Sequence, residues 1–391
     1  MAMQLTNVRE HNLGTVLNTL ASSDAPLSRA TLAQATGLTK PTVSRLVDEL
    51  LAAGFLIEHA PTRAVGAAGG RPSVPVSIAQ AAVVGLGASV SADHVAVNMI
   101  DMRRQVVAVA ETPVTRAPTP RDAVVLIADL AAELLAANPH TRTSGICVSV
   151  PGRLSPDGRR VQSAPNLGWE DAPLAELLET APGLEDLDVS VENDARLVAE
   201  TEIVNRRGEG FVLVYGESGI GGAVVVDGDI QRGANGWGGE IGHLCLDPRG
   251  PECRCGRRGC LEAYASYWAI AQQSMQTGSG YISEFFTSLE GDAREAAIER
   301  IGSSLGLALS QVLNIVDLPT VVLGGYFRHL AADIAPLVNA QLDRHALAVE
   351  AGGVRIETTT AAARPSLAGA ALRAIQPVFD APAEWIRRFE A

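Results

Sequence analysis

Apolar and polar positions in the N-terminal part of the chain follow a pattern that predicts three short helices and then two strands. Over residues 7–22 the leucines and valines fall three and four positions apart, so they share one face of an amphipathic helix. A second helix is predicted over 28–37 and a third over 39–54. Each begins at a Ser or Thr capping residue and ends at a glycine. Segments 54–60 and 73–79 predict strands joined by a glycine-rich loop.

This order of elements is typical of a winged helix-turn-helix, which predicts a DNA-binding domain over residues 1–80. The third helix buries Val43 and Leu46, so its other face presents short polar and basic side chains to base edges and phosphates. The predicted DNA-contacting residues of this helix are Thr39, Lys40, Thr42, Ser44 and Arg45. In the glycine-rich loop, Arg71 is a candidate for the adjacent minor groove, although the loop is equally consistent with a solvated linker. A small helical interaction module is the alternative for the whole domain.

Beyond residue 80 the pattern changes to strands that alternate with helices. Apolar runs predict successive strands over 83–114 and further strands around 144–151 and 211–230. Between them, RDAVVLIADLAAELLAA is an amphipathic helix, and DVSVENDARLVAETEIV passes from strand to helix. This alternation predicts an α/β body over residues 81–391.

Composition and charge restrict where a DNA contact can lie. The chain has 391 residues and a net charge of −13, but the first 78 residues carry six Lys or Arg and five Asp or Glu. The remainder carries 25 basic and 39 acidic residues, so the body repels phosphates and a DNA contact belongs to the head. No apolar run approaches the ~20 residues of a membrane span, and no secretory signal is apparent. We therefore expect a cytoplasmic protein.

Three of the five cysteines fall within eight residues, which predicts a metal site. Cys253, Cys255 and Cys260 form a C-x-C-x₄-C knuckle, and His243 precedes it. One imidazole and three thiolates suit tetrahedral zinc, and four protein ligands leave no open position, so one structural zinc per chain is predicted. Reduced cysteines around a tight turn are the alternative. Cys147 lies in an apolar strand and is expected in the core.

The chain resembles the ROK family of bacterial repressors and sugar kinases. The resemblance extends over about 82–391 and rests on motifs in a fixed order: APNLGW, VEND, GESGIGG, RGANGWGGEIGH, CRCGRRGCLEAYAS and VVLGGYF. It implies an actin-like (ribonuclease H-like) two-lobed sugar-kinase fold. Together with the winged helix-turn-helix, the resemblance is to the repressor branch.

The resemblance also implies a sugar-binding site. The family's positions correspond here to Asn166, Asn193, Asp194, Glu240, His243 and Glu262. Carboxylates and amides of this kind can pair with vicinal hydroxyls. In the family's kinases the aspartate at position 194 is the general base. Taken alone, an Asn-Asp pair before a helix is more often an N-cap.

The sequence departs from the kinases where ATP phosphates would bind. The kinase turn G-x-D-x-G-G-T is replaced by residues 85–91, in which Gly87 stands for the aspartate and Ser89 and Val90 for the glycines. In the second phosphate loop, G-T-G-I-G-G in kinases, Glu217 adds a carboxylate beside the phosphate path. Because phosphoryl transfer depends on positioning and charge neutralisation, we expect no kinase activity.

These observations predict a sugar-responsive regulator, a repressor of carbohydrate uptake or metabolism genes. It would bind a double-stranded operator as a homodimer or homotetramer and bind a sugar or sugar phosphate without phosphorylating it. An active ATP-dependent sugar kinase is the second hypothesis. A purely structural zinc scaffold is the third, and it leaves the polar residues of the sugar motifs unexplained.

Overall fold

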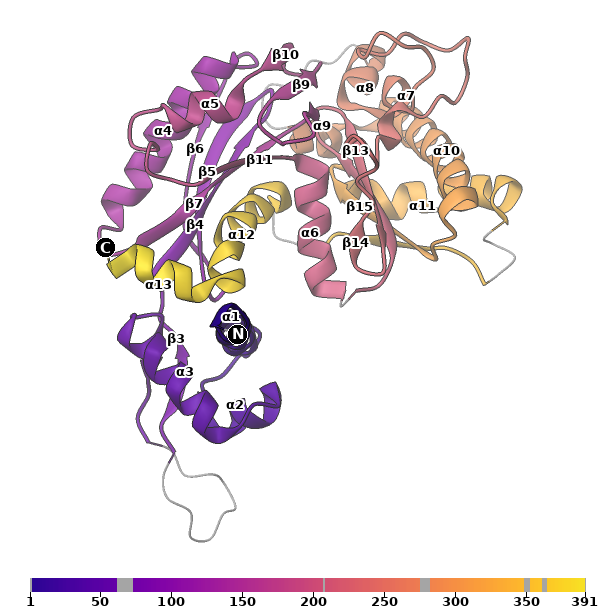
Figure 1. Cartoon of the computed structure of the whole chain (residues 1–391). Coiled ribbons are helices and arrows are strands. Elements are labelled where there is room, and N and C mark those ends of the chain that lie inside the picture. Colours follow the sequence, from indigo (N-terminus) through magenta and orange to yellow (C-terminus); the bar gives the residue numbers. More distant parts are fainter. Residues whose placement is uncertain are drawn as a thin grey trace.

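A computed structural model of the protein describes residues 2–61, 73–206, 208–274, 282–347, 352–360 and 364–390. The chain forms a small N-terminal head and a body of two lobes, each built on a five-stranded sheet (Figure 1). The predicted α/β body behind a helix-turn-helix head is therefore confirmed. In the described part of the chain, no helix has the length and apolar character needed to cross a bilayer.

The head contains the three predicted helices and a small antiparallel sheet in the order β1-β3-β2. Both predicted caps are present: the Ser28 hydroxyl accepts from the Thr31 amide at 3.1 Å, and the Thr39 hydroxyl accepts from the Thr42 amide at 3.4 Å. Gly37 ends the second helix at a φ of 71°, a conformation that glycine adopts readily. The elements are α1 (Ala2–Ala21), β1 (Leu27–Ser28), α2 (Arg29–Thr36), α3 (Lys40–Ala52), β2 (Leu56–Glu58) and β3 (Pro75–Ile78).

The first lobe has a sheet in the order β11-β7-β4-β5-β6, with a helix on each face. Because side chains alternate along a strand, Val84 and Leu86 of β4 join a core with α4, whereas Gly85 and Gly87 face α12. The elements are β4 (Val83–Val90), β5 (His94–Asp101), β6 (Val106–Pro113), α4 (Pro120–Ala137), β7 (Arg142–Val150), β8 (Arg153–Leu154), β9 (Val161–Ala164), β10 (Trp169–Ala172), α5 (Leu174–Glu179), β11 (Val189–Asn193) and α12 (Pro365–Asp380).

The second lobe has a sheet in the order β14-β13-β12-β15-β16. Val212 and Val214 of β12 pack with the long helices α10 and α11, whereas Leu213 packs with α6 on the opposite face. The elements are α6 (Asp194–Arg206), β12 (Phe211–Gly216), β13 (Ile220–Val226), β14 (Asp229–Ile230), η1 (Ile241–His243), α7 (Glu262–Ala265), α8 (Tyr267–Ser274), α9 (Ile282–Ser288), α10 (Gly291–Val316), β15 (Thr320–Gly325), α11 (Phe327–His345) and β16 (Arg355–Thr358).

The head shares a hydrophobic core with the C-terminal end of the chain. Leu13 and Leu17 of α1 lie in one buried cluster with Phe379 of α12 and Trp385 of α13 (Pro382–Glu390). The α13 backbone is also tied to α1, because the Ala383 amide donates to the Glu10 carboxylate at 2.8 Å. Helix α12 therefore contacts both the sheet of the first lobe and the first helix of the head (Figure 1).

Candidate sugar pocket and metal centre

Six residues predicted from the family resemblance line one cavity between the lobes. They are Asn166, Asn193, Asp194, Glu240, His243 and Glu262. The first follows β9, the next two form the junction of β11 and α6, and the last three belong to the second lobe. The cavity has a volume of about 60 Å³, which is room for a few water molecules. The pocket is therefore narrow.

Asn193 has a structural role as well as a place in the pocket. Its Oδ1 accepts from the Arg196 amide at 3.2 Å, as an N-cap does, and its Nδ2 donates to the Gly152 carbonyl at 3.1 Å. The N-cap interpretation of this motif therefore holds for Asn193. The amide nitrogen carries a second hydrogen, which a ligand oxygen can accept.

Burial governs the protonation of the pocket carboxyls. It raises the pKa of Asp194 to about 8, and repulsion from Glu217 and Glu240 acts in the same direction. Burial also raises the pKa of Glu240 and of Glu262. Asp194 is therefore mostly protonated at neutral pH, so it can donate a hydrogen bond to a hydroxyl. A general base, by contrast, requires the ionised form.

The opposite wall of the pocket contains an unsatisfied acceptor. In the described part of the chain, the buried Oδ1 of Asn166 has no hydrogen-bond partner. The neighbouring Glu262 carboxylate accepts from the Ile220 amide at 2.9 Å. A Cβ on Gly219, just before β13, would collide with the ends of the Asn166 and Glu262 side chains, so a larger residue there would displace them. A ligand hydroxyl could donate to Asn166.

Sequence reasoning missed two residues that hold the glycine-rich loop over 231–239 in place, Arg196 of α6 and Trp237 of the loop itself. Arg196 lines the pocket and donates to the Gly236 carbonyl. The indole N–H of Trp237 donates to the Leu154 carbonyl at 3.2 Å, and the Arg153 guanidinium lies 5.0 Å from the Trp237 ring centroid. An arginine within the VENDAR segment and a tryptophan among glycines were the available signals.

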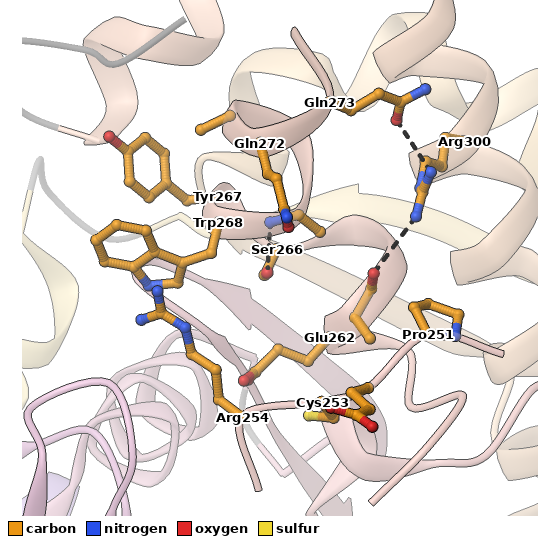
Figure 2. Close-up of a pocket in the computed structure, with 14 residues that line it drawn as sticks. Pro251, Cys253, Arg254, Glu262, Ser266, Tyr267, Trp268, Gln272, Gln273 and Arg300 are labelled. Atoms are coloured by element: carbon orange, nitrogen blue, oxygen red, sulfur yellow. Dashed lines mark hydrogen bonds between the residues drawn. The ribbon is translucent and has the colours of Figure 1, made fainter. Parts of the chain in front are cut away.

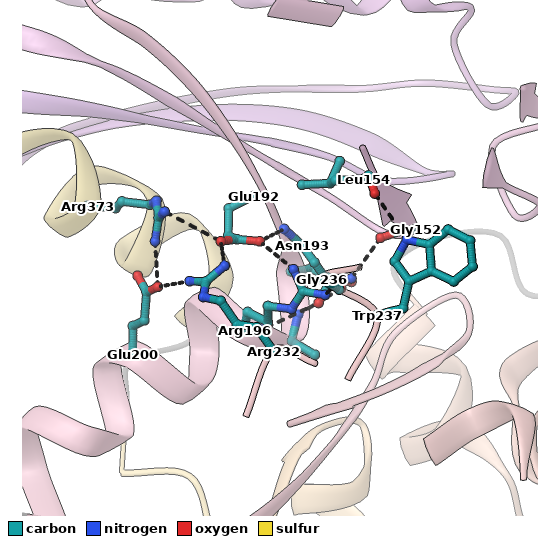
Figure 3. A network of polar contacts seen from close by, with 12 residues as sticks. Gly152, Leu154, Glu192, Asn193, Arg196, Glu200, Arg232, Gly236, Trp237 and Arg373 are labelled. Carbon is teal, nitrogen blue, oxygen red and sulfur yellow. Dashed lines mark hydrogen bonds and ion pairs between the residues drawn. The ribbon is translucent and has the colours of Figure 1, made fainter. Parts of the chain in front are cut away.

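The buried Glu192 is the centre of an ionic network beside the pocket (Figure 3). Its carboxylate pairs with Arg196 at 3.1 Å and with Arg232 at 2.6 Å, and Arg373 of α12 lies 3.5 Å away. Burial alone would raise the pKa of Glu192, but Arg373 and Arg232 outweigh burial and hold this pKa below its ordinary value. Glu200 pairs with Arg373 at 2.5 Å and with Arg232 at 3.2 Å. The network therefore links β11 and α6 to α12.

The four predicted metal ligands lie together. One ligand atom from each of His243, Cys253, Cys255 and Cys260 lies within 4.8 Å of all the others. The Cys255 and Cys260 sulfurs are 3.8 Å apart, which is about the edge of a tetrahedron with 2.3 Å zinc–sulfur bonds. His243 Nδ1 lies 3.8 Å from the Cys253 sulfur, and its Nε2 lies 3.9 Å from the Glu240 carboxylate at the sugar pocket.

The backbone and the other cysteines agree with this cluster. Gly256 and Gly259 adopt φ values of 81° and 70° in the knuckle, where a side chain would be strained. Cys245 is exposed and lies outside the cluster, whereas Cys147 is buried in the core of the first lobe, as predicted. The donor set fits a closed tetrahedral metal site, in which these four side chains would be the ligands.

The position of the kinase aspartate has no room for a side chain. A Cβ on Gly87 would lie 2.5 Å from the Leu367 carbonyl oxygen and from the Ala371 amide nitrogen, both in the backbone of α12. Strand β4 also continues to Val90 without a turn at positions 88–90. Helix α12 thus lies against β4 where a kinase would carry an acidic side chain.

Glu217 lies in the segment predicted to correspond to the second phosphate loop of the kinases. Its carboxylate accepts from the Tyr215 hydroxyl at 3.2 Å. Burial raises the pKa of Glu217, His94 opposes this shift, and Asp93 adds to it. Asp93 and His94 form an ion pair at 2.7 Å at the tip of the β4–β5 hairpin. Three ionisable side chains therefore influence one another here.

Helix α3 exposes the predicted DNA-contacting residues to solvent. Thr39, Lys40 and Arg45 are exposed, and Thr42 and Ser44 are half-buried. Among the described residues, neither Lys40 nor Arg45 forms an ion pair, whereas Arg29 pairs with Asp48 at 2.7 Å. Of the head's cations that the structure describes, those without an ion-pair partner thus lie on the predicted DNA-contacting face. Arg71 lies outside the described residues.

Fold and site together define a class: a two-lobed, sugar-kinase-like body that carries a helix-turn-helix head. The chain belongs to the ROK family, whose model matches residues 86–376, and the IclR helix-turn-helix domain model matches residues 12–58. The family predicted from the motifs is therefore confirmed.

Relatives include both repressors and kinases. The xylose repressor of Bacillus subtilis (strain 168) is 28% identical over 309 residues, covering 77% of this chain and 78% of that protein. The glucokinase of Halalkalibacterium halodurans is 29% identical over 238 residues, covering 55% of this chain and 71% of that protein.

Solved structures confirm the fold over nearly the whole chain. A ROK family transcriptional regulator, a homolog of the E. coli MLC protein, superposes with a TM-score of 0.76 at 22% identity and covers 98% of this chain and 100% of that one. A ROK family glucokinase from Streptomyces griseus, in complex with glucose and AMPPNP, has a TM-score of 0.61 at 20% identity. It covers 75% of this chain and 99% of its own.

Proposed function

We propose that this protein is a sugar-responsive, DNA-binding repressor of genes for carbohydrate uptake or metabolism. Residues 1–80 form the DNA-binding domain and residues 81–391 the effector domain, which binds a sugar without phosphorylating it. The observation that carries the proposal is the packing of α12 against Gly87, beside a complete set of sugar-pocket residues. Relatives that are repressors support the same function.

Sugar binding in this pocket relies on hydrogen bonds to hydroxyl groups. Protonated Asp194 donates, the unsatisfied Oδ1 of Asn166 accepts, and Glu240 and Glu262 accept from further hydroxyls. A ligand that lacks one of these hydroxyls leaves a buried polar group unpaired, which gives selectivity among sugars. The pocket is narrow as it stands, so a sugar would favour an arrangement in which the lobes lie further apart.

Helix α12 is the element that can transmit this change to the head. Asp194 begins α6, and α6 packs so closely on α12 that a Cβ on Gly369 would collide with the Leu197 backbone. The other end of α12 places Phe379 in the core of the head. Lobe opening would move α6 relative to the first lobe, and α12 would carry that change to α1. A sugar that binds one arrangement of the two lobes more tightly than the other would then change the affinity of the head for DNA.

Zinc has a structural role in this proposal. The His243 and Cys253–Cys255–Cys260 cluster supports one zinc per chain. Zinc held by His243 and the three cysteines would fix the imidazole ring, whose Nε2 lies 3.9 Å from the Glu240 carboxylate at the pocket. Zinc bound here would supply rigidity and no reaction step.

The repressor acts as a homodimer or homotetramer on a repeated operator. Lys40 and Arg45 belong to one short helix, and a single head makes few base contacts. Two heads on one duplex raise the affinity through effective concentration. Half-sites would lie about one helical turn, or a multiple of it, apart.

The test is to separate the two activities by mutation. Operator binding and sugar binding are measured on wild type, Asp194→Ala and Arg45→Ala, and ATP consumption is measured with a panel of hexoses. Asp194→Ala should bind DNA but lose the sugar response. Arg45→Ala should lose DNA binding but still bind the sugar. ATP-dependent sugar phosphorylation that Asp194→Ala abolishes would favour the second hypothesis, a kinase, which the glucokinase relatives also represent.

A further inference from the structure

A second cavity, of about 720 Å³, lies beside the metal cluster (Figure 2). This volume is typical of small-molecule sites. Its wall includes Arg254 of the metal knuckle, Tyr267 and Trp268 of α8, and Arg300 of α10. Glu262 lines both this cavity and the sugar pocket, so the two cavities share a wall.

Two adjacent hydrogen-bond donors in this cavity lack acceptors. The Arg254 guanidinium lies 4.0 Å from the centroid of the Trp268 ring. The indole N–H of Trp268 is buried, and within the described ranges no acceptor reaches it. Within the same ranges, no carboxylate lies within ion-pair distance of Arg254, although the charge of Glu262 acts on it across the cavity wall. A buried donor without a partner loses the free energy of its hydrogen bond to water, and a bound ligand can restore that loss.

Two arginine side chains line the cavity and form no ion pair among the described residues. Arg300 lies across the cavity from Arg254 in Figure 2, and its donors meet neutral acceptors, the Tyr264 carbonyl at 2.9 Å and the Gln273 side chain at 3.0 Å. Two carboxyl groups also line the cavity: Glu252 pairs with Arg258, and Glu262 accepts from the Ile220 amide at 2.9 Å. Two arginines without carboxylate partners are notable in a chain of net charge −13.

We propose that this cavity binds an anionic small molecule whose phosphate or carboxylate group accepts hydrogen bonds from Arg254 and from the Trp268 indole N–H. Phosphate and carboxylate groups both accept charge-assisted hydrogen bonds from a planar guanidinium. The apolar Tyr267 ring then packs against the carbon part of the ligand. The site is separate from the sugar pocket and does not depend on the proposed function. Its ligand would be a second effector.

The test is calorimetric titration of the zinc-loaded, full-length protein with inorganic phosphate, glycerol 3-phosphate and citrate. Trp268→Phe removes the N–H but keeps an aromatic ring, and Arg254→Gln removes the charge. Each change should weaken binding of the preferred probe about ten-fold. Asn193→Ala, in the sugar pocket, should leave this affinity unchanged. The tighter of glycerol 3-phosphate and citrate identifies phosphate or carboxylate as the recognised group.

Absence of binding for all three probes at millimolar concentration overturns the proposal. So does binding that Trp268→Phe leaves unchanged, or binding that Asn193→Ala abolishes. Zinc content is measured for each variant, because Arg254 lies between two metal ligands. If Arg254→Gln loses zinc, the Trp268→Phe result alone decides. Sugar-dependent DNA release, assayed separately on the same variants, tests the proposed function and is independent of this outcome.

Discussion

Replacing Asp194 by Asn should stabilise the protein at neutral pH. Burial holds the pKa of Asp194 at about 8, against 3.8 for an ordinary aspartate. Between these two values the folded state binds a proton that the unfolded state has released. The stability of the wild type therefore falls as pH rises from about 4 to about 8, and above that the effect is complete. Asparagine does not titrate, so the stability of the variant does not fall in this way as pH rises.

The magnitude follows from the span of pH that is covered. One pH unit within this window is worth about 1.36 kcal/mol. Between pH 5 and pH 7 the stability advantage of Asp194→Asn over wild type should thus grow by about 2 to 3 kcal/mol. The unfolding entropy of a 391-residue chain is roughly 0.8 kcal/mol per kelvin, so that growth corresponds to a melting-temperature difference of roughly 2 to 4 °C.

The assay is thermal unfolding of both proteins at half-unit steps from pH 5 to pH 8. Asp186→Asn, an exposed position, serves as the matched control and should follow the wild-type profile. Parallel profiles for Asp194→Asn and wild type would refute the reasoning, because they would show that Asp194 is ionised at neutral pH. The ionised carboxylate would then be available as a general base.

The remaining predictions concern the metal, the phosphate path and the head. Metal analysis should find one zinc per chain in the wild type and little in Cys255→Ser, which should also be less stable; equal zinc and equal stability would contradict the ligand assignment. Gly87→Asp should lower the free energy of unfolding by about 1–3 kcal/mol, since α12 must shift, and should restore no ATP consumption. A stable, sugar-phosphorylating Gly87→Asp protein would refute the role of α12. Arg45→Ala should reduce the slope of log affinity against log salt by about one in DNA titrations, and an unchanged slope would exclude a phosphate contact.

Local signals were predictable from the sequence, and long-range contacts were not. Ser28, Thr39 and Gly37 act through neighbours a few residues away, so their caps and turn followed from residue type. The six pocket residues followed from motif resemblance, although nothing local indicates that they meet.

The close approach of Gly87 to Ala371 joins positions far apart in the sequence, as does the packing of Phe379 in the head. Neither contact leaves a periodic signal, because each depends on how a whole helix lies. The donors of Arg254 and Trp268 became visible only once their neighbours were in place.

The central claim is that a sugar in the interlobe pocket controls DNA binding without being phosphorylated. The most direct test is fluorescence anisotropy of a labelled operator, selected from random duplexes and titrated with hexoses and pentoses in the absence of ATP. One sugar should weaken DNA binding by about 5- to 150-fold, the range of a typical coupling free energy. Asp194→Ala should bind the operator and ignore the sugar. An operator affinity that no sugar changes, or that changes only with ATP while ADP accumulates, would contradict the account.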